Sequence, residues 1–131
     1  MIRTLVTSLA IAILGAAHGW AETKNVTWTG WFSDQGCASG RATSGVFTPT
    51  NPECAKKCIE KGAEPVFIGE EAKAIYKVKD YPSVVDDLGW RLEITGTVDE
   101  SAKTISVSSV KRLSAVVLSC GRQRKSGVTK E

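Results

Sequence analysis

Alternating apolar and polar positions predict the longer strands of this chain. In residues 25–34 (NVTWTGWFSD), Val26, Trp28, Gly30 and Phe32 alternate with Thr27, Thr29 and Trp31, which is the pattern of a half-buried strand. Residues 90–98 (WRLEITGTV) alternate in the same way, and Ile105 and Val107 continue that phase in the next segment. We therefore expect residues 90–98 and the segment around Ile105 to form an antiparallel hairpin.

Shorter elements fill the middle of the chain. Residues 65–68 form a short apolar run, and in residues 74–78 Ile75 and Lys77 alternate with Tyr76 and Val78. With the Gly-Glu-Glu turn at 69–71 between them, this predicts a second hairpin. Residues 81–88 carry apolar side chains at helical spacing and are followed by Gly89, so a short helix is expected there.

A helix bearing two cysteines is predicted before the hairpin at residues 65–78. Asn51–Glu53 supplies an N-cap, a proline at the first helical position and an acid in the first turn, and Gly62 follows the last residues of the helix. Cys54 and Cys58 fall on one face of it because they are four residues apart. The preceding stretch, residues 35–50, is rich in Gly, Ser and Thr and predicts a long loop.

These elements predict a mainly β fold, with five short antiparallel strands, one helix that carries cysteines and one short helix. Their order favours an OB-fold-like β-barrel, in which Gly30 and Gly96 would allow the sheet to bend. An open meander with the cysteine helix laid on one face predicts the same strands. In either case one core is expected to contain Trp28, Phe32, Ile75, Leu92, Ile94, Ile105 and Val107.

The first 21 of the 131 residues have the pattern of a signal peptide. Arg3 precedes an uncharged apolar run at residues 5–17, and Gly19 and Ala21 are the small residues expected before a cleavage site at Glu22. The apolar run is shorter than the roughly 20 residues that span a bilayer. We expect export to the periplasm or secretion, no membrane span, and a folded domain at 22–113.

The absence of histidine from the expected mature chain excludes several enzyme classes. His18, the single histidine, lies in the signal peptide, so imidazole bases, Ser-His-Asp triads and His-ligated metals are not expected. Asp86 and Asp87 are adjacent and would point in different directions, and Asp34 is better placed to cap a turn than to catalyse. The sequence therefore predicts a protein that is not an enzyme and has no cofactor.

The net charge of +3 lies outside the predicted domain. Residues 22–113 contain twelve Lys or Arg against thirteen Asp or Glu, while residues 114–131 contain four basic side chains and one acid. We expect 114–131 to be a basic, partly flexible tail. Without a basic face on the domain, nucleic acid is not an expected partner. We expect a monomer whose partner is an unidentified ligand or protein.

Several segments resemble a group of small secreted bacterial OB-fold-like proteins of unknown function. They are TGWFSDQGC at 29–37, CAKKCIEKGAEPVFI at 54–68, YKV at 76–78 and RLEITGTVD at 91–99. The group shares a GW, D-x-x-C, C-x-x-x-C pattern followed by two hairpins, and the similarity covers about residues 29 to 110. It implies secretion and a small barrel, and it supplies no catalytic residue.

Four cysteines in an exported chain favour disulfides, and four allow three pairings. Cys54 and Cys58, one turn apart on a helix, form the least favourable pair. We expect Cys37 to bond to Cys58, which lies deeper along the helix, and Cys54 to bond to Cys120. The alternative is a thiol-based redox or metal-handling role for Cys54 and Cys58, although no metal site is predicted.

A non-catalytic binding or structural module is therefore the predicted function, with disulfides that stabilise it. Trp31 and Tyr76 are the aromatic residues whose strand phase would place them on the outer face, where they could contact a ligand. Trp31 turns inward instead if Gly30 forms a bulge. Arg41, in the predicted loop, is the third candidate ligand-binding residue.

Overall fold

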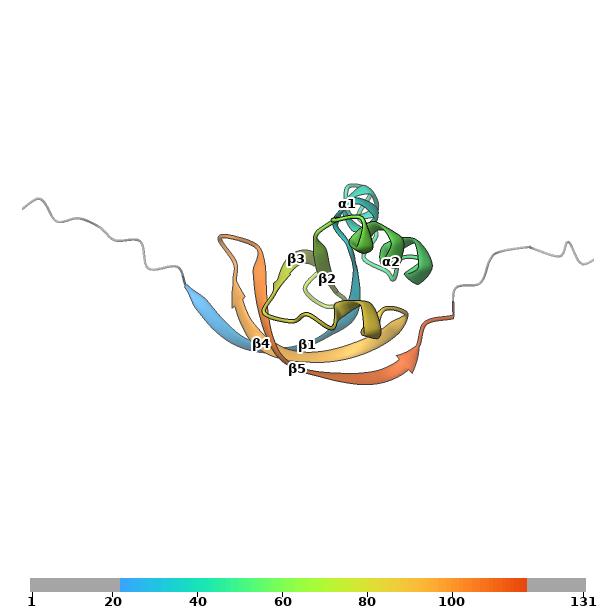
Figure 1. The fold of residues 1–131 in the computed structure, drawn as a ribbon. Helices are drawn as coiled ribbons and strands as arrows, with labels where there is room; N and C mark the ends of the chain where they lie inside the picture. Colours follow the sequence, from blue (N-terminus) through green and yellow to red (C-terminus); the bar gives the residue numbers. More distant parts are fainter. Residues whose placement is uncertain (1–21, 118–131) are drawn as a thin grey trace, which may run out of the picture.

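The computed structural model describes residues 22–117, which form a curved five-stranded sheet with two helices over one part of it (Figure 1). In chain order the elements are β1 (Thr23–Asp34), α1 (Gln35–Ala42), α2 (Pro52–Glu60), β2 (Pro65–Gly69), β3 (Ala74–Lys79), the 3₁₀ helix η1 (Val84–Asp87), β4 (Trp90–Asp99) and β5 (Thr104–Ala115). The predicted signal peptide, Cys120 and most of the predicted tail lie outside the described residues.

The five strands pair in a ring in the order β1-β2-β3-β5-β4, and β4 pairs with β1 again. Four of the five pairings are antiparallel. The fifth joins β3 to β5 in parallel over three residue pairs, from Lys77 with Thr104 to Lys79 with Ser106. An open meander has no such parallel pairing, so this closed sheet with mixed strand directions excludes the open meander that the sequence also allowed. It also corrects the expectation that all strands are antiparallel.

The two glycines that the sequence predicts as bending positions lie where strand pairing changes or is irregular. β1 pairs with β4 over Thr23–Gly30 and with β2 over Gly30–Asp34, so Gly30 is where the strand changes partner. A β-carbon at Gly30 would lie 2.0 Å from the carbonyl oxygen of Ile68. A β-carbon at Gly96, next to an irregularity in the β4–β5 register, would lie 2.2 Å from the Ser106 oxygen. Only glycine allows these backbones to approach so closely.

Residues from all five strands and η1 form the main core inside the closed sheet. Its buried members are Phe32, Phe67, Tyr76, Val84, Leu92, Ile94, Val98, Ile105 and Val107. Five of the seven predicted core residues are therefore confirmed as buried together, and Trp28 packs against them while remaining partly exposed.

The predicted phase of β3 is wrong by one residue. Tyr76 points into the main core with 2% of its surface exposed, and Ile75 packs against a different cluster. The Tyr76 ring lies 5.1 Å from that of Trp28, and its hydroxyl lies 3.2 Å from both carboxylate oxygens of Glu100. A tyrosine fits inside such a sheet when its hydroxyl reaches a polar group at the end of the core.

The first half of the predicted 35–50 loop is a helix, α1, and this corrects the expectation of a continuous loop. The Cys37 N–H donates to Oδ2 of Asp34 at 3.0 Å, so Asp34 is the N-cap of α1. Ala38, on the inner side of α1, packs with Trp31, Val66 and Ile68 in a second buried cluster. The helix thus covers the face of β1 that would otherwise be exposed.

The predicted cysteine helix is confirmed as α2. Oδ1 of Asn51 accepts hydrogen bonds from the N–H groups of Glu53 at 2.9 Å and Cys54 at 3.2 Å, which is the capping that the sequence predicts. At the other end of the chain, β5 continues to Ala115 and crosses the predicted domain boundary at residue 113.

Candidate functional site

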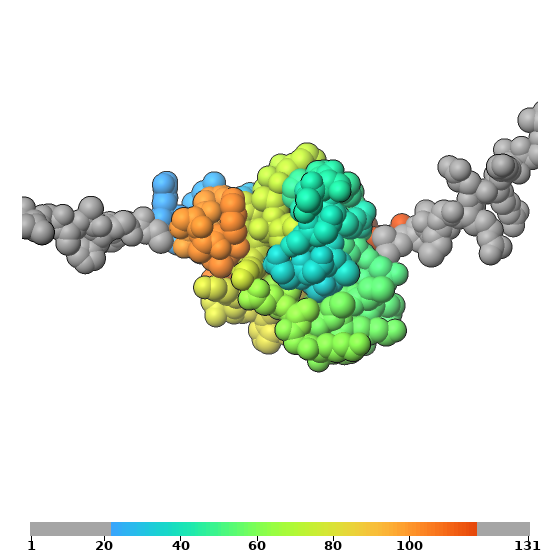
Figure 2. Space-filling view, turned by 90° about the horizontal axis from the view of Figure 1, so that it is seen from above, coloured from blue at the N-terminus to red at the C-terminus, as the bar shows by residue number. Residues whose placement is uncertain are grey.

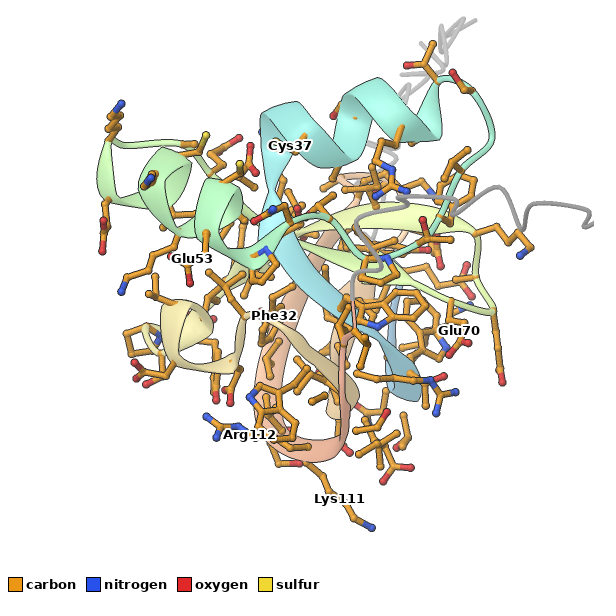
Figure 3. All side chains as sticks on the ribbon, turned by 90° about the vertical axis from the view of Figure 1, so that its right-hand side faces the viewer. Phe32, Cys37, Glu53, Glu70, Lys111 and Arg112 are labelled. Carbon is orange, nitrogen blue, oxygen red and sulfur yellow. The ribbon has the colours of Figure 1, made fainter. Side chains whose placement is uncertain are left out.

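The helices α1 and α2 form a cap over one part of the sheet, and the cap carries the three described cysteines. Figure 2 shows the two helices side by side on one face of the molecule. Figure 3 places Cys37 in the first turn of α1, above Phe32 of the core. Cys54 and Cys58 lie on α2; Cys54 is exposed, whereas Cys37 and Cys58 are half-buried.

Cys37, Cys54 and Cys58 are free thiols, and no two cysteines among residues 22–117 lie at disulfide distance. The predicted bond between Cys37 and Cys58 is thus not formed in this structure. Its predicted companion, between Cys54 and Cys120, involves a residue outside the described part of the chain. Cys37 lies on α1 and Cys58 on α2, so a bond between them would join the two helices of the cap.

Asp34 is the charged residue closest in sequence to Cys37, and it acts on the Cys37 thiol. Interaction of the thiol with the Asp34 carboxylate is the largest cause that raises the pKa of Cys37 to about 11. Burial and the negative charge of Asp34 raise it further, and the thiols of Cys58 and Cys54 add smaller effects in the same direction. The raised pKa makes the Cys37 thiol harder to ionise than an ordinary cysteine.

Three buried polar residues, Ser33, Asp34 and Thr50, lie where β1 ends and the helical cap begins. The hydroxyls of Ser33 and Thr50 form a hydrogen bond that joins the end of β1 to the residue before the N-cap of α2. Asp34 follows directly and is 2% exposed. Sequence reasoning missed the Ser33–Thr50 contact because both residues are common in exposed turns and no pattern relates them.

Two of the three predicted ligand-binding residues are inside the molecule. Trp31 does lie on the face of β1 away from the main core, as its strand phase predicts, but α1 covers it and leaves it 8% exposed. Tyr76 lies in the main core, so its expected place on the outer face is wrong. Arg41 is exposed, as predicted for a loop residue, but it lies on α1. Its guanidinium donates to the carbonyl of Pro49 at 2.6 Å and to Oγ1 of Thr48 at 2.7 Å, and so braces the segment that follows the helix.

A cluster of hydrogen-bonded side chains around Asp87, away from the cysteines, was not predicted. Asp86 and Asp87 do point in different directions: Asp86 is exposed and Asp87 is buried. The Asp87 carboxylate accepts from Tyr81 Oη at 2.5 Å and from Arg112 Nε at 2.7 Å. The hydrogen bond to Asp87 is the main cause that raises the pKa of Tyr81 to about 12. Arg112 also lies over the Trp90 ring, so the cluster fastens η1 to β4 and β5.

Several kinds of site can be assessed over residues 22–117. No three His, Cys, Asp or Glu side chains are grouped there so as to hold a metal ion. No surface pocket is found in the same part of the chain. Its helices are all too short or too polar to cross a membrane. The cap, with its three thiols and the buried Asp34, is therefore the best candidate site.

Comparisons with protein-family models, with curated proteins and with solved structures find no match to this chain.

Proposed function

We propose that this chain is an exported, non-catalytic binding or structural module with an OB-fold, in which a disulfide between Cys37 and Cys58 fastens the helical cap. The observation that carries the proposal is the closed strand order β1-β2-β3-β5-β4 with a cysteine-bearing cap inserted between β1 and β2. The periplasm or the outside of the cell is the proposed location, because thiols oxidise there.

Three features support the OB-fold. The strand β1 is shared between two pairings, with Gly30 at the change of partner. The pairing of β3 with β5 is short and parallel. A helical turn, η1, stands between β3 and β4. This combination is typical of the five-stranded Greek-key barrel, in which the loops after β1 and between β4 and β5 contact ligands.

The composition of the cap supports the disulfide. Within α1 only Ala38 is buried, and within α2 only Ala55, so each helix buries little apolar surface against the sheet. A bond from Cys37 to Cys58 would close a loop of about 20 residues and stabilise the fold by about 3 kcal/mol. It would join the start of α1 to the last turns of α2.

The segment at residues 43–50 is the proposed contact surface for a protein partner. It belongs to the first inter-strand connection, and Arg41 holds it against the end of α1. Val46 is exposed on it, and Phe47 anchors it to the second buried cluster. This surface replaces Trp31 and Tyr76 as the proposed contact site, since both of those are covered.

Peptide mapping without reductant, on full-length protein exported to an oxidising compartment, tests the proposal. We expect Cys37 and Cys58 in one disulfide-linked peptide pair. We also expect Cys37→Ser to lower the free energy of unfolding by about 2–4 kcal/mol. In reductant, the variant and the wild type should unfold at similar denaturant concentrations. Recovery of Cys37 as a free thiol from the exported protein would overturn the disulfide.

A thiol-based redox or metal-handling function is the second candidate, and the free, exposed Cys54 one turn from Cys58 favours it. Titration of the reduced protein with Cu(I) and with Zn²⁺, followed by calorimetry, tests it, and a Cys54→Ser, Cys58→Ser protein is the control. Stoichiometric binding that the control lacks, with release of the metal on thiol alkylation, would support this function over the structural one.

A further inference from the structure

The second half of β5 has a partner strand on one side only. β5 pairs with β4 from Thr104 to Ala115, but its pairing with β3 on the other side ends at Ser106. Figure 1 shows the rest of β5, in orange-red, running along the edge of the sheet next to β4. Among the described residues, no backbone hydrogen bond joins 107–115 to an element other than β4. Because every second residue of such a strand directs its N–H and C=O groups outward, this edge presents open hydrogen-bonding groups.

The side chains along this edge are exposed and include a cation and apolar groups. Lys111 is exposed, and Figure 3 shows it pointing away from the sheet. Leu113 is 38% exposed, and Val117, just beyond the strand, is 86% exposed. Neither of these apolar side chains packs in the two buried clusters. A partner with both charged and apolar side chains would therefore match this edge.

Positive charge is concentrated in this end of the chain. Residues 101–130 contain seven basic side chains and no acid, whereas residues 22–100 contain nine basic and thirteen acidic side chains. Arg112 is paired with Asp87 at 2.7 Å. Lys111 lies opposite Glu93 in the strand register, but within the described part of the chain it forms no ion pair. The edge of β5 therefore presents a lysine that is available to an acidic partner, and the basic tail follows it directly.

We propose that the edge of β5 at residues 107–115 binds an extended acidic segment of another protein, which joins the sheet as an additional strand. A side chain opposite Lys111 on the added strand would lie about 5 Å from it, and Glu93 would be one strand farther away. An acid at that position is therefore attracted more than it is repelled. The inference goes beyond the proposed function, because it involves neither the segment at 43–50 nor the disulfide of the cap.

A second copy of this chain fits the edge less well than an acidic strand does. Two β5 edges side by side would bring the basic residues of both copies together, and like charges on neighbouring strands are destabilising. The first part of β1, residues 23–29, also pairs with β4 alone, but it carries Lys24 and no acid. Neither edge of the chain thus supplies the charge that Lys111 would attract.

The shape of β5 also limits what can pair with it. The β4–β5 register is irregular between Arg91 and Leu92 and between Thr95 and Gly96. Bulges and lysines on an edge strand discourage indiscriminate pairing. They leave a regular run at 109–112, which suits a short acidic segment better than a long flat strand.

Binding of a short labelled peptide of alternating glutamate and valine to the full-length exported protein tests the proposal. We expect saturable binding, measured by fluorescence anisotropy, that weakens as the salt concentration rises. The control peptide has the same sequence and charge but is N-methylated at two adjacent central residues. Because adjacent residues direct their N–H groups to opposite edges, these methyl groups block pairing on both. The loss of backbone hydrogen bonds should weaken binding by about tenfold or more.

A charge-reversed variant tests the contribution of Lys111. Lys111→Glu places an acid opposite the peptide glutamates, and we expect it to weaken binding by about tenfold. Lys56→Glu changes the net charge equally at an exposed position on α2, and we expect it to leave the affinity nearly unchanged. Equal weakening by both variants would contradict binding at β5.

Hydrogen exchange of the wild-type protein, measured by mass spectrometry, locates the bound peptide without any substitution. We expect exchange to slow in residues 107–115 and to stay unchanged in residues 43–50. Equal binding of the N-methylated peptide, or slower exchange only outside 107–115, would overturn the proposal. Dimers that protect 107–115 without any peptide would assign the edge to a second copy and overturn it as well. The disulfide of the proposed function is tested separately by peptide mapping, so failure here leaves it standing.

Discussion

Replacing Gly30 with alanine should destabilise the protein strongly, because the added methyl group has no space. The new β-carbon would lie 2.0 Å from the Ile68 carbonyl oxygen and 2.6 Å from Cζ of Phe67. Favourable contacts between carbon atoms begin at about 3.5 Å, so the backbone of β2 would have to move by about 1.5 Å. That movement would open the pairing of β1 with β2 at the point where β1 changes partner.

Overpacking costs typically about 1–3 kcal/mol when side chains can shift. The main obstacle here is a backbone oxygen within a strand pair, so we expect Gly30→Ala to lower the free energy of unfolding by about 3 kcal/mol or more. That loss changes the folding equilibrium more than a hundredfold. It is also a large part of the about 5–15 kcal/mol that stabilises most domains.

Urea unfolding followed by tryptophan fluorescence measures the change, and a lower midpoint with an unchanged slope would indicate lost stability. The matched control is Gly40→Ala. That glycine lies inside α1 with no atom within 4 Å of the added β-carbon. Because alanine favours helix, the control should gain about 0.5–1 kcal/mol. A Gly30→Ala protein within 0.5 kcal/mol (roughly the usual range for surface substitutions) of the wild type would refute the reasoning.

Three further predictions concern the core, the Asp87 cluster and the tail. Ile94→Ala should lower the free energy of unfolding by about 2–5 kcal/mol in the same urea assay, since Ile94 is fully buried, and a loss under about 0.5 kcal/mol would place it on the surface. Because Asp87 raises the pKa of Tyr81, the Tyr81–Asp87 hydrogen bond stabilises the protein fully below about pH 10, and this stabilisation is lost as pH rises toward 12. Denaturant midpoints measured across this pH range should therefore decline in the wild type and decline less in Tyr81→Phe. Truncation after Ser119 should leave the midpoint of thermal unfolding nearly unchanged, apart from any contribution of a Cys120 bond. Truncation after Ala115 should lower that midpoint, because it removes the Val116 N–H, which donates to the Gly89 carbonyl at 2.8 Å.

The order and approximate bounds of most elements could be predicted because they depend on local patterns. The alternation in residues 90–98 and the capping at Asn51 determine β4 and the start of α2 with little help from distant parts of the chain. The need for glycine at positions 30 and 96 was also predictable, since large neighbours in a strand make an isolated glycine conspicuous.

The missed features depend on contacts between distant segments. The α1 sequence, QGCASGRA, contains two glycines and is a poor helix by propensity, and it forms because Asp34 caps it and Trp31 packs beneath Ala38. In β3, both faces carry apolar residues, so alternation alone could not decide between Ile75 and Tyr76. The second half of β5 is mostly exposed and is held by its pairing with β4.

Contacts between distant segments also explain which residues of the candidate site could be predicted. The sequence identifies Asp34 and the three cysteines as residues of interest, but Trp31 was assigned to an exposed face because the helix that covers it was expected to be a loop. An aspartate at the end of a strand, three residues before Cys37, was the available signal for a helix N-terminus.

The pairing of β1 with β4 also sets the order in which the fold can form. It joins residues far apart in the chain: the hydroxyls of Thr27 and Thr95, which contact each other, are 68 residues apart, and the Thr97–Asn25 hydrogen bond spans 72. Domains dominated by such distant pairings fold in milliseconds to seconds, because a large loop must close before any contact rewards it. During synthesis, β1 cannot pair with β4 along its whole length until Asp99, the partner of Thr23, has emerged from the ribosome. Until then one edge of the first strand stays open, and it is the place where a chaperone or a second nascent chain would bind.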